Sequence, residues 1–133
     1  MKFMVDTHIL IWAFNNPAKI HDDITHILTN EDNAVYFSQI SLWEIAIKYR
    51  LGKLDLKGHT PEEFFCAVEK SFIRCQALAS EDLISSYRLP LKHKDPFDRM
   101  IVWQCIRGGF ILLSADSSFE AYEENCLQLI LNN

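Results

Sequence analysis

The sequence lacks the features that mark multidomain and membrane proteins. It contains no repeat, no low-complexity segment and no linker, so residues 1–133 are expected to form one domain with a sizeable core. The N-terminal stretch MKFMVDTHILIWAFNN has an apolar run that Asp6 and His8 interrupt, and no small-residue cleavage site follows it. We therefore expect neither a signal peptide nor a membrane span.

Positive charge and paired cysteines are also scarce. The formal net charge is −5, whereas a plain nucleic-acid-binding domain usually has a basic footprint, although a cluster of functional acids could mask one. The cysteines are far apart and form no C-x-x-C pair: Cys66, Cys75, Cys105 and Cys126. We expect buried reduced thiols in a cytoplasmic protein rather than disulfides or a zinc site.

Short apolar runs alternate with amphipathic stretches along the chain. The pattern predicts strands at residues 2–5, 34–37, 110–115 and 127–131. It predicts helices at 9–14, 22–29, within 38–54, and at 61–74, 80–88, 95–106 and 118–123, so the middle of the chain is expected to be helical throughout. Strands that alternate with helices predict an α/β fold, with a mainly parallel central sheet flanked by helices on both faces.

Four acids fall close to the ends of predicted strands. Asp6 and Asp116 each end a strand, Glu44 lies in the first turn after the second strand, and Asp98 lies in the first turn of its own helix. In an open α/β sheet, ligands bind beyond the carboxyl ends of the strands, so these acids are expected to converge. Clustered carboxylates repel one another and favour Mg²⁺ or Mn²⁺, which activate water and stabilise phosphoryl charge in nucleases and phosphatases.

Each acid also has a structural interpretation. Ser41 and Glu44 fit an S-x-x-E capping box, and Glu44 can pair with Lys48 one turn later. Asp6 and Asp116 can be ordinary caps of the helices that follow them. Independent capping does not require several acids at coincident strand ends, so the set as a whole favours a functional site.

The segment KDPFDRMI contains two aspartates with different expected roles. Proline is favoured at the first helical position, so Pro96 makes Asp95 the N-cap and places Asp98 at the third helical position. Asp98 then shares a side of the helix with Val102 and Cys105, which turns it partly inward. Asp95 is therefore expected to cap the helix, and Asp98 is the candidate metal ligand.

Four segments resemble the successive motifs of the PIN domain, particularly of the VapC-type toxins of toxin–antitoxin modules: VDTHILIWAF, SQISLWEIAIKYRLGKL, LPLKHKDPFDRMIVWQC and LLSADSSFEAY. The resemblance implies a Mg²⁺- or Mn²⁺-dependent endoribonuclease. Its catalytic, metal-binding residues would be Asp6, Glu44, Asp98 and Asp116. Thr7 and Ser114 would be supporting hydroxyls, and Ser117 stands where some relatives carry a further acid. The implied partners are an RNA such as tRNA or rRNA, a cognate VapB-like antitoxin and a second copy in a homodimer.

Basic residues flank the acidic segments and are candidates for contacts with RNA phosphates: Arg50, Lys92, Lys94 and Arg99. Lys48 and Lys53 fit a solvated helix face at least as well. None of the five histidines forms a recognisable acid–base pair, so metal-assisted hydrolysis is favoured over histidine activation of the RNA 2′-hydroxyl.

Other functions fit the residues less well. A haloacid dehalogenase-type, metal-dependent phosphatase would need D-x-D after the first strand, where position 8 is histidine. A receiver domain would need a lysine at a late strand end, where Ser114-Ala115-Asp116 stands. A non-catalytic PIN-fold binding module stays open as an alternative. In a toxin, we expect an antitoxin arginine or lysine among the acids, with apolar surface around Trp12, Trp43 and Phe64-Phe65, although core packing is the expected role of most of these aromatic residues.

Overall fold

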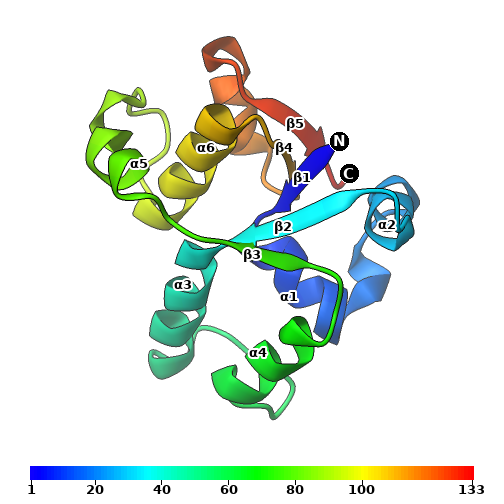
Figure 1. Cartoon of the computed structure of the whole chain (residues 1–133). Helices are drawn as coiled ribbons and strands as arrows, with labels where there is room; N and C mark the ends of the chain where they lie inside the picture. The colour runs from blue at the N-terminus through cyan, green and yellow to red at the C-terminus, as the bar shows by residue number, and fades with distance from the viewer.

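The computed structural model describes residues 1–133, in which five parallel strands form one sheet between helices (Figure 1). Every neighbouring pair of strands is parallel. In spatial order the strands are β3 (Arg74–Gln76), β2 (Ala34–Ser38), β1 (Lys2–Val5), β4 (Ile111–Ser114) and β5 (Gln128–Leu131). The predicted α/β class with a parallel central sheet is confirmed.

Helices make every connection between consecutive strands. β1 is followed by α1 (Thr7–Asn15), the 3₁₀ helix η1 (Pro17–Lys19) and α2 (Asp22–Thr29). β2 is followed by α3 (Gln39–Arg50) and α4 (Pro61–Glu69), and β3 by α5 (Ser80–Ser85), the 3₁₀ helix η2 (Ser86–Arg88) and α6 (Pro96–Gly108). The 3₁₀ helix η3 (Ser117–Asn125) connects β4 to β5.

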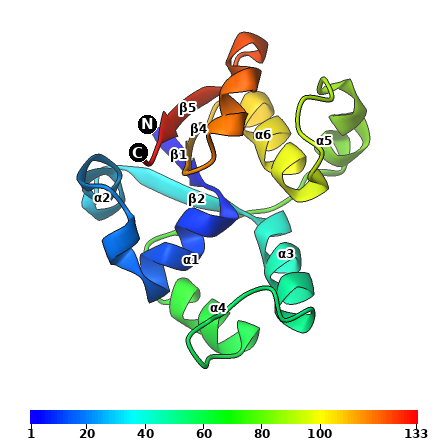
Figure 2. The ribbon, with the colours of Figure 1, turned by 180° about the vertical axis from the view of Figure 1, so that it is seen from behind.

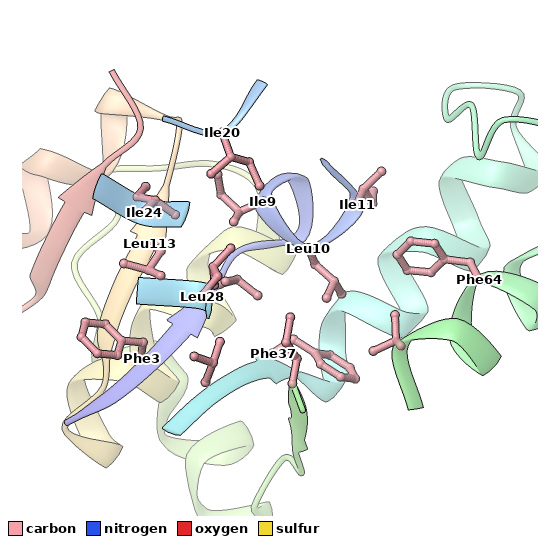
Figure 3. Packing of buried hydrophobic residues seen from close by; sticks show 14 of the residues in the cluster. Phe3, Ile9, Leu10, Ile11, Ile20, Ile24, Leu28, Phe37, Phe64 and Leu113 are labelled. Atoms are coloured by element: carbon pink, nitrogen blue, oxygen red, sulfur yellow. The ribbon is translucent and has the colours of Figure 1, made fainter. Parts of the chain in front are cut away.

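The strands bury side chains on both faces, which accounts for their nearly continuous apolar sequences. Phe3 and Leu113 point to one face, where Figure 3 shows them with Ile9 of α1 and with Ile24 and Leu28 of α2.

The opposite face has a second core. Its strand residues are Met4 and Leu112, and its helical residues include Ile101 of α6 and Phe119 of η3. The two cores confirm that helices cover both faces of the sheet.

The expected helix from residue 61 to 74 is wrong in its last five residues. α4 ends at Glu69, and the hydroxyl of Ser71 donates to the carbonyl oxygen of Val68 and accepts from the backbone N–H of Ile73, closing the helix end. Residues 74–76 then pair in parallel with β2 as the edge strand β3. Three residues are too short to show an alternating pattern, so only the pairing identifies this strand.

The two ends of α6 follow the sequence prediction. The Asp95 side chain accepts from the backbone N–H groups of Phe97 at 2.8 Å and Asp98 at 3.3 Å, which confirms it as the N-cap. At the other end Gly109 has φ of 72°, the left-handed conformation that glycine adopts without steric cost.

The cysteines are free, but most are not buried. Only Cys105 lies in a core, whereas Cys66, Cys75 and Cys126 are exposed. The expectation of buried thiols is therefore wrong for these three. They lie on the outer side of α4, on the edge strand β3 and at the end of η3, where no second layer covers them. No helix is both long enough and apolar enough to cross a membrane.

Candidate active site

The acids of the candidate site lie around the carboxyl ends of β1, β2 and β4. Asp6 follows β1 directly, and Asp116 lies two residues after β4. These two strands are neighbours at the position where the strand order reverses, because β1 leads to β2 on one side and β4 leads to β5 on the other. Figure 2 shows the first turns of α1, α3 and α6 meeting beyond this edge. Ligands of open α/β sheets bind at such a switch point.

Asp6 is held rigidly at the end of β1. Its side chain is buried, and one carboxylate oxygen accepts from the backbone N–H of Ile9 at 2.9 Å, so Asp6 also caps α1. The other oxygen accepts from the Ser114 hydroxyl, whose oxygen in turn accepts from the backbone N–H of Asp116 at 3.0 Å. Ser114 thus links the ends of β1 and β4. Burial raises the pKa of Asp6, and the charge of Glu44 raises it further.

Glu44 is 1% exposed and fully engaged with its neighbours. One carboxylate oxygen accepts from the Thr7 hydroxyl at 2.6 Å, and the other pairs with Lys48, as its i,i+4 spacing predicts. Thr7 Oγ1 also lies 2.8 Å from Ser41 Oγ. These contacts connect the start of α1 to α3 and orient the Glu44 carboxylate.

The predicted capping box at Ser41 and Glu44 is wrong. Strand β2 leads directly into α3, and the cap is Ser38, whose hydroxyl oxygen accepts from the backbone N–H of Ile40 at 3.2 Å. Ser41 therefore lies inside the helix, and Glu44 lies in its second turn rather than its first. Its carboxylate makes tertiary contacts with the start of α1 in place of a local cap.

The acidity of Asp98 is strongly perturbed. Burial, followed by the charges of Asp95, Glu44 and Asp6, raises its pKa from 3.8 to about 7, against the opposing effect of Lys48. The carboxylates therefore lie close enough to repel one another across different elements. A carboxyl group whose pKa is raised first by burial and then by neighbouring acids is typical of a site that takes a cation.

Asp116 differs from the other acids because it is largely solvated, with its side chain 46% exposed. Partial burial acts to raise its pKa, but hydrogen bonds from Ser118 and His93 outweigh this and lower it. Its carboxylate caps η3 by accepting from the backbone N–H of Ser118 at 2.9 Å. An ionised carboxylate therefore stands at the open side of the site.

Two groups of side chains place potential ligand atoms within 4.8 Å of one another. One group contains His93, Asp98 and Asp116, and the other contains Glu44, Asp95 and Asp98. Asp98 belongs to both, whereas Asp6 belongs to neither and acts on Asp98 through its charge. The acids thus gather around Asp98, and Asp95 adds a carboxylate to its capping role.

His93 is the residue that sequence reasoning missed. Its Nε2 lies 3.5 Å from Asp98 Oδ2 and 3.4 Å from Asp116 Oδ2, so it does lie beside acids. The partners are 5 and 23 residues away in sequence and come from different elements, so no local motif marks them. The only sequence signal is the position of His93 two residues before the N-cap of α6.

The four candidate phosphate-binding side chains divide into two pairs. Lys92 is held by Glu124, by the carbonyl oxygen of Ala121 and by the Asn125 side chain. Arg99 donates to the carbonyl oxygens of residues 89 and 90 and to the hydroxyl of residue 122. Phosphate binding would require both side chains to give up these bonds. Arg50 and Lys94 are exposed.

An open cavity of about 360 Å³ adjoins the acids. Asp6 and Asp116 form its acidic wall, and His8, Trp12 and Ala115 complete its lining. The cavity gives a ligand direct access from solvent to the end of β1.

The fold and the site define an α/β domain with an acidic cluster at its switch point. The family model that matches the sequence is that of the PIN domain, over residues 3–125, and the chain belongs to this family. No curated protein matches the chain in sequence.

Chains of several solved structures resemble this one over nearly its whole length. A chain of VapBC2 from Rickettsia felis, bound to a promoter DNA fragment, superposes with a TM-score of 0.74 at 16% identity and covers 100% of both chains. A chain of DNA-bound VapBC from Salmonella typhimurium superposes with a TM-score of 0.72 at 19% identity. The match covers 100% of this chain and 99% of the Salmonella chain. A chain of VapBC-1 from nontypeable Haemophilus influenzae superposes with a TM-score of 0.65 at 19% identity, and the match covers 98% of each chain. These likenesses show a shared fold.

Proposed function

We propose that the chain is the toxin of a toxin–antitoxin pair, an endoribonuclease that hydrolyses RNA phosphodiester bonds with Mg²⁺ or Mn²⁺. The observation that carries this proposal is the convergence of carboxylates on Asp98, with Glu44 of α3 and Asp116 at the start of η3 close enough to share an ion with it, and with the pKa of Asp98 raised by burial and by neighbouring acids. Membership of the PIN family and the likeness to chains of VapBC complexes support the same assignment.

The donor set suits a hard divalent cation. Carboxylate oxygens are the ligands that Mg²⁺ and Mn²⁺ prefer, and Asp98 would hold the ion with Glu44 or with Asp116, whereas Asp95 stays engaged as the N-cap of α6. When bound, such an ion activates water and stabilises charge on a phosphate oxygen. Asp6 would add negative charge that favours the ion.

Neighbouring hydroxyls would keep the ligands in place. Thr7 donates to Glu44 and Ser114 donates to Asp6, so neither carboxylate is free to rotate away from the site. Lys48 offsets the charge of Glu44. Arg50 and Lys94 are the basic residues best placed to bind the RNA backbone, because their side chains are exposed.

The surface offers apolar area for an antitoxin or for a second copy in a homodimer. Phe64 belongs to the core, in line with the core packing expected of most of these aromatic residues, and Trp43 is the one that is well exposed. The α5–η2 segment exposes Ile84, Tyr87 and, after it, Leu91. Exposed apolar groups of this size favour a protein interface, and the acids favour an antitoxin arginine or lysine between them.

Cleavage of total RNA, which contains the tRNA and rRNA that we propose as substrates, tests the enzymatic assignment. The wild-type protein should cut RNA with Mg²⁺ or Mn²⁺ and stop in EDTA. Asp98→Asn should be inactive, whereas Asp32→Asn, a substitution of an exposed acid in the turn before β2, should cut normally. Hydrolysis of a small phosphate ester without RNA cleavage would indicate a phosphatase, and no hydrolysis of either would indicate a binding module.

Co-expression tests the assignment to a toxin–antitoxin pair. When it is expressed alone in the cytoplasm, the chain should arrest the growth of the host cells. It should be harmless and co-purify when expressed with the product of the adjacent reading frame. A chain that is monomeric and harmless alone would contradict the toxin assignment without affecting the nuclease assignment.

A further inference from the structure

His93 occupies a central position between two acids of the candidate site. It lies in the segment between η2 and α6, and its Nε2 is 3.5 Å from the Asp98 carboxylate and 3.4 Å from the Asp116 carboxylate. Asp98 belongs to the first turn of α6, whereas Asp116 caps η3. His93 is thus the one side chain that touches the carboxylates of both elements.

The ring of His93 is held in place on its other sides. It stacks on Phe119, with the ring centroids 5.3 Å apart and the planes 21° from parallel. Its backbone N–H donates to the Tyr122 hydroxyl at 3.0 Å. Phe119 and Tyr122 are fully buried, so the ring rests on a packed surface of η3.

One further contact determines which ring nitrogen carries the proton. The backbone N–H of Asp95 donates to His93 Nδ1 at 3.2 Å. Because a backbone N–H can only donate, Nδ1 must accept and therefore has no proton in the neutral ring. The proton then lies on Nε2, the nitrogen that faces Asp98 and Asp116.

This tautomer argues against His93 as a metal ligand. Binding an ion through Nε2 would move the proton to Nδ1, where it would face the Asp95 N–H across the same 3.2 Å contact. Two donors would then oppose each other beside the N-cap of α6. The Nε2–H group is instead suited to donate a hydrogen bond to the carboxylates.

We propose that His93 is a positioning residue: its Nε2–H donates to Asp116 and faces Asp98 at 3.5 Å, and it holds the two carboxylates at the spacing at which they bind a divalent ion. Groups that hydrogen-bond to metal ligands in this way fix ligand orientation, and their loss typically weakens metal binding about 10–100-fold. The inference rests on the proposed function, because it concerns the same metal site.

Two substitutions separate this role from support of the loop. In His93→Gln the side-chain amide nitrogen reaches roughly as far as Nε2 and can still donate to the acids, but the acceptor for the Asp95 N–H is lost. In His93→Asn the side-chain oxygen stays near the position of Nδ1 and can still accept from Asp95, but no donor reaches the acids. The exposed His26 of α2 provides a matched control, His26→Asn.

The measurements are the Mn²⁺ dissociation constant by isothermal titration calorimetry and the melting temperature in EDTA. We expect both variants to melt below the wild-type protein without metal, because both lose the stacking on Phe119, and His93→Gln to melt the lower of the two because it also loses the acceptor for the Asp95 N–H. We expect His93→Asn to bind Mn²⁺ about 10–100-fold more weakly than the wild-type protein, and His93→Gln to bind it within about 3-fold of the wild-type protein, a small change on that scale. His26→Asn should leave both quantities unchanged.

An affinity for Mn²⁺ in His93→Asn equal to that of the wild-type protein would overturn the inference. Equal loss of Mn²⁺ affinity in the two His93 variants would also overturn it, because glutamine keeps the donor to the acids. A wild-type protein that does not bind Mn²⁺ would overturn the proposed function and the inference together. The two failures are therefore distinguishable.

Discussion

Replacing Asp98 by asparagine should abolish activity while making the metal-free protein more stable. The substitution removes a carboxylate whose ionised form is disfavoured by burial and by the neighbouring acids, as its pKa of about 7 indicates. The amide is nearly the same size, so the packing of α6 should not change. Loss of function and gain of stability in one variant would distinguish a metal ligand from an ordinary surface acid.

The size of the gain follows from the acidity of Asp98. The difference between 3.8 and about 7 corresponds to at most ~4 kcal/mol, at about 1.4 kcal/mol for each pH unit. Solvent reaches part of the side chain and screens these charges, so we expect about 1–2 kcal/mol. For a chain of this length that gain corresponds to a rise in melting temperature of about 4–8 °C.

The gain should depend on pH in a defined direction. Below about pH 4, Asp98 is protonated in the folded and unfolded states, and the substitution should have little effect. Between pH 3.8 and about 7 the unfolded chain ionises while the folded protein keeps the proton, so the wild-type protein loses stability as pH rises. The difference in free energy of unfolding should therefore grow from pH 4 to pH 7 and then level off.

Thermal melting in EDTA at several pH values, with RNA cleavage in Mn²⁺ at pH 7.5, measures both effects. Asp95 provides the control. Asp95→Asn keeps a capping side chain and most of the activity, whereas Asp95→Ala loses the cap and about 1 kcal/mol of stability. The reasoning fails if Asp98→Asn melts below the wild-type protein at pH 7.5. It also fails if Asp95→Asn abolishes cleavage and Asp98→Asn does not.

Three further outcomes are expected. Millimolar Mn²⁺ or Mg²⁺ should raise the melting temperature, because an ion at 100 times its dissociation constant stabilises the folded state by about 2.7 kcal/mol; a melting curve indifferent to metal and to chelator counts against the site. Thr7→Val should cost about 1–3 kcal/mol in urea unfolding, because Glu44 loses a buried donor. An unchanged urea midpoint would mean that Lys48 alone satisfies that carboxylate. Replacing Arg50 and Lys94 by glutamine should weaken RNA binding in a gel-shift assay without changing the melting temperature, since both side chains are exposed; unchanged binding would exclude them from the RNA surface.

Sequence patterns predicted the elements whose signals are local. The apolar runs of β1, β2, β4 and β5 were recognisable because parallel strands are buried on both faces. The start and end of α6 were predictable from Asp95-Pro96 and Gly109, because a cap depends only on residues within one turn. From strand ends alone, four acids could be expected near one edge of the sheet.

Features that depend on long-range contacts could not be predicted in the same way. β3 is a strand because β2 offers it an unpaired edge, and Glu44 is oriented by Thr7 from a separate helix rather than by a cap. Lys92 and Arg99 lie beside the acids in sequence, yet the folded chain directs both toward other groups.

The chemistry of the site shows the same division. The sequence by itself determined that carboxylates stand at strand ends and that Asp95 caps α6, because both depend on neighbours along the chain. Only the tertiary structure decided that Asp98 lies at the centre of the acids, with its pKa near 7, and that His93 contacts Asp98 and Asp116. Burial and charge repulsion depend on distances between elements, and the packing of α6 and η3 against the sheet sets those distances.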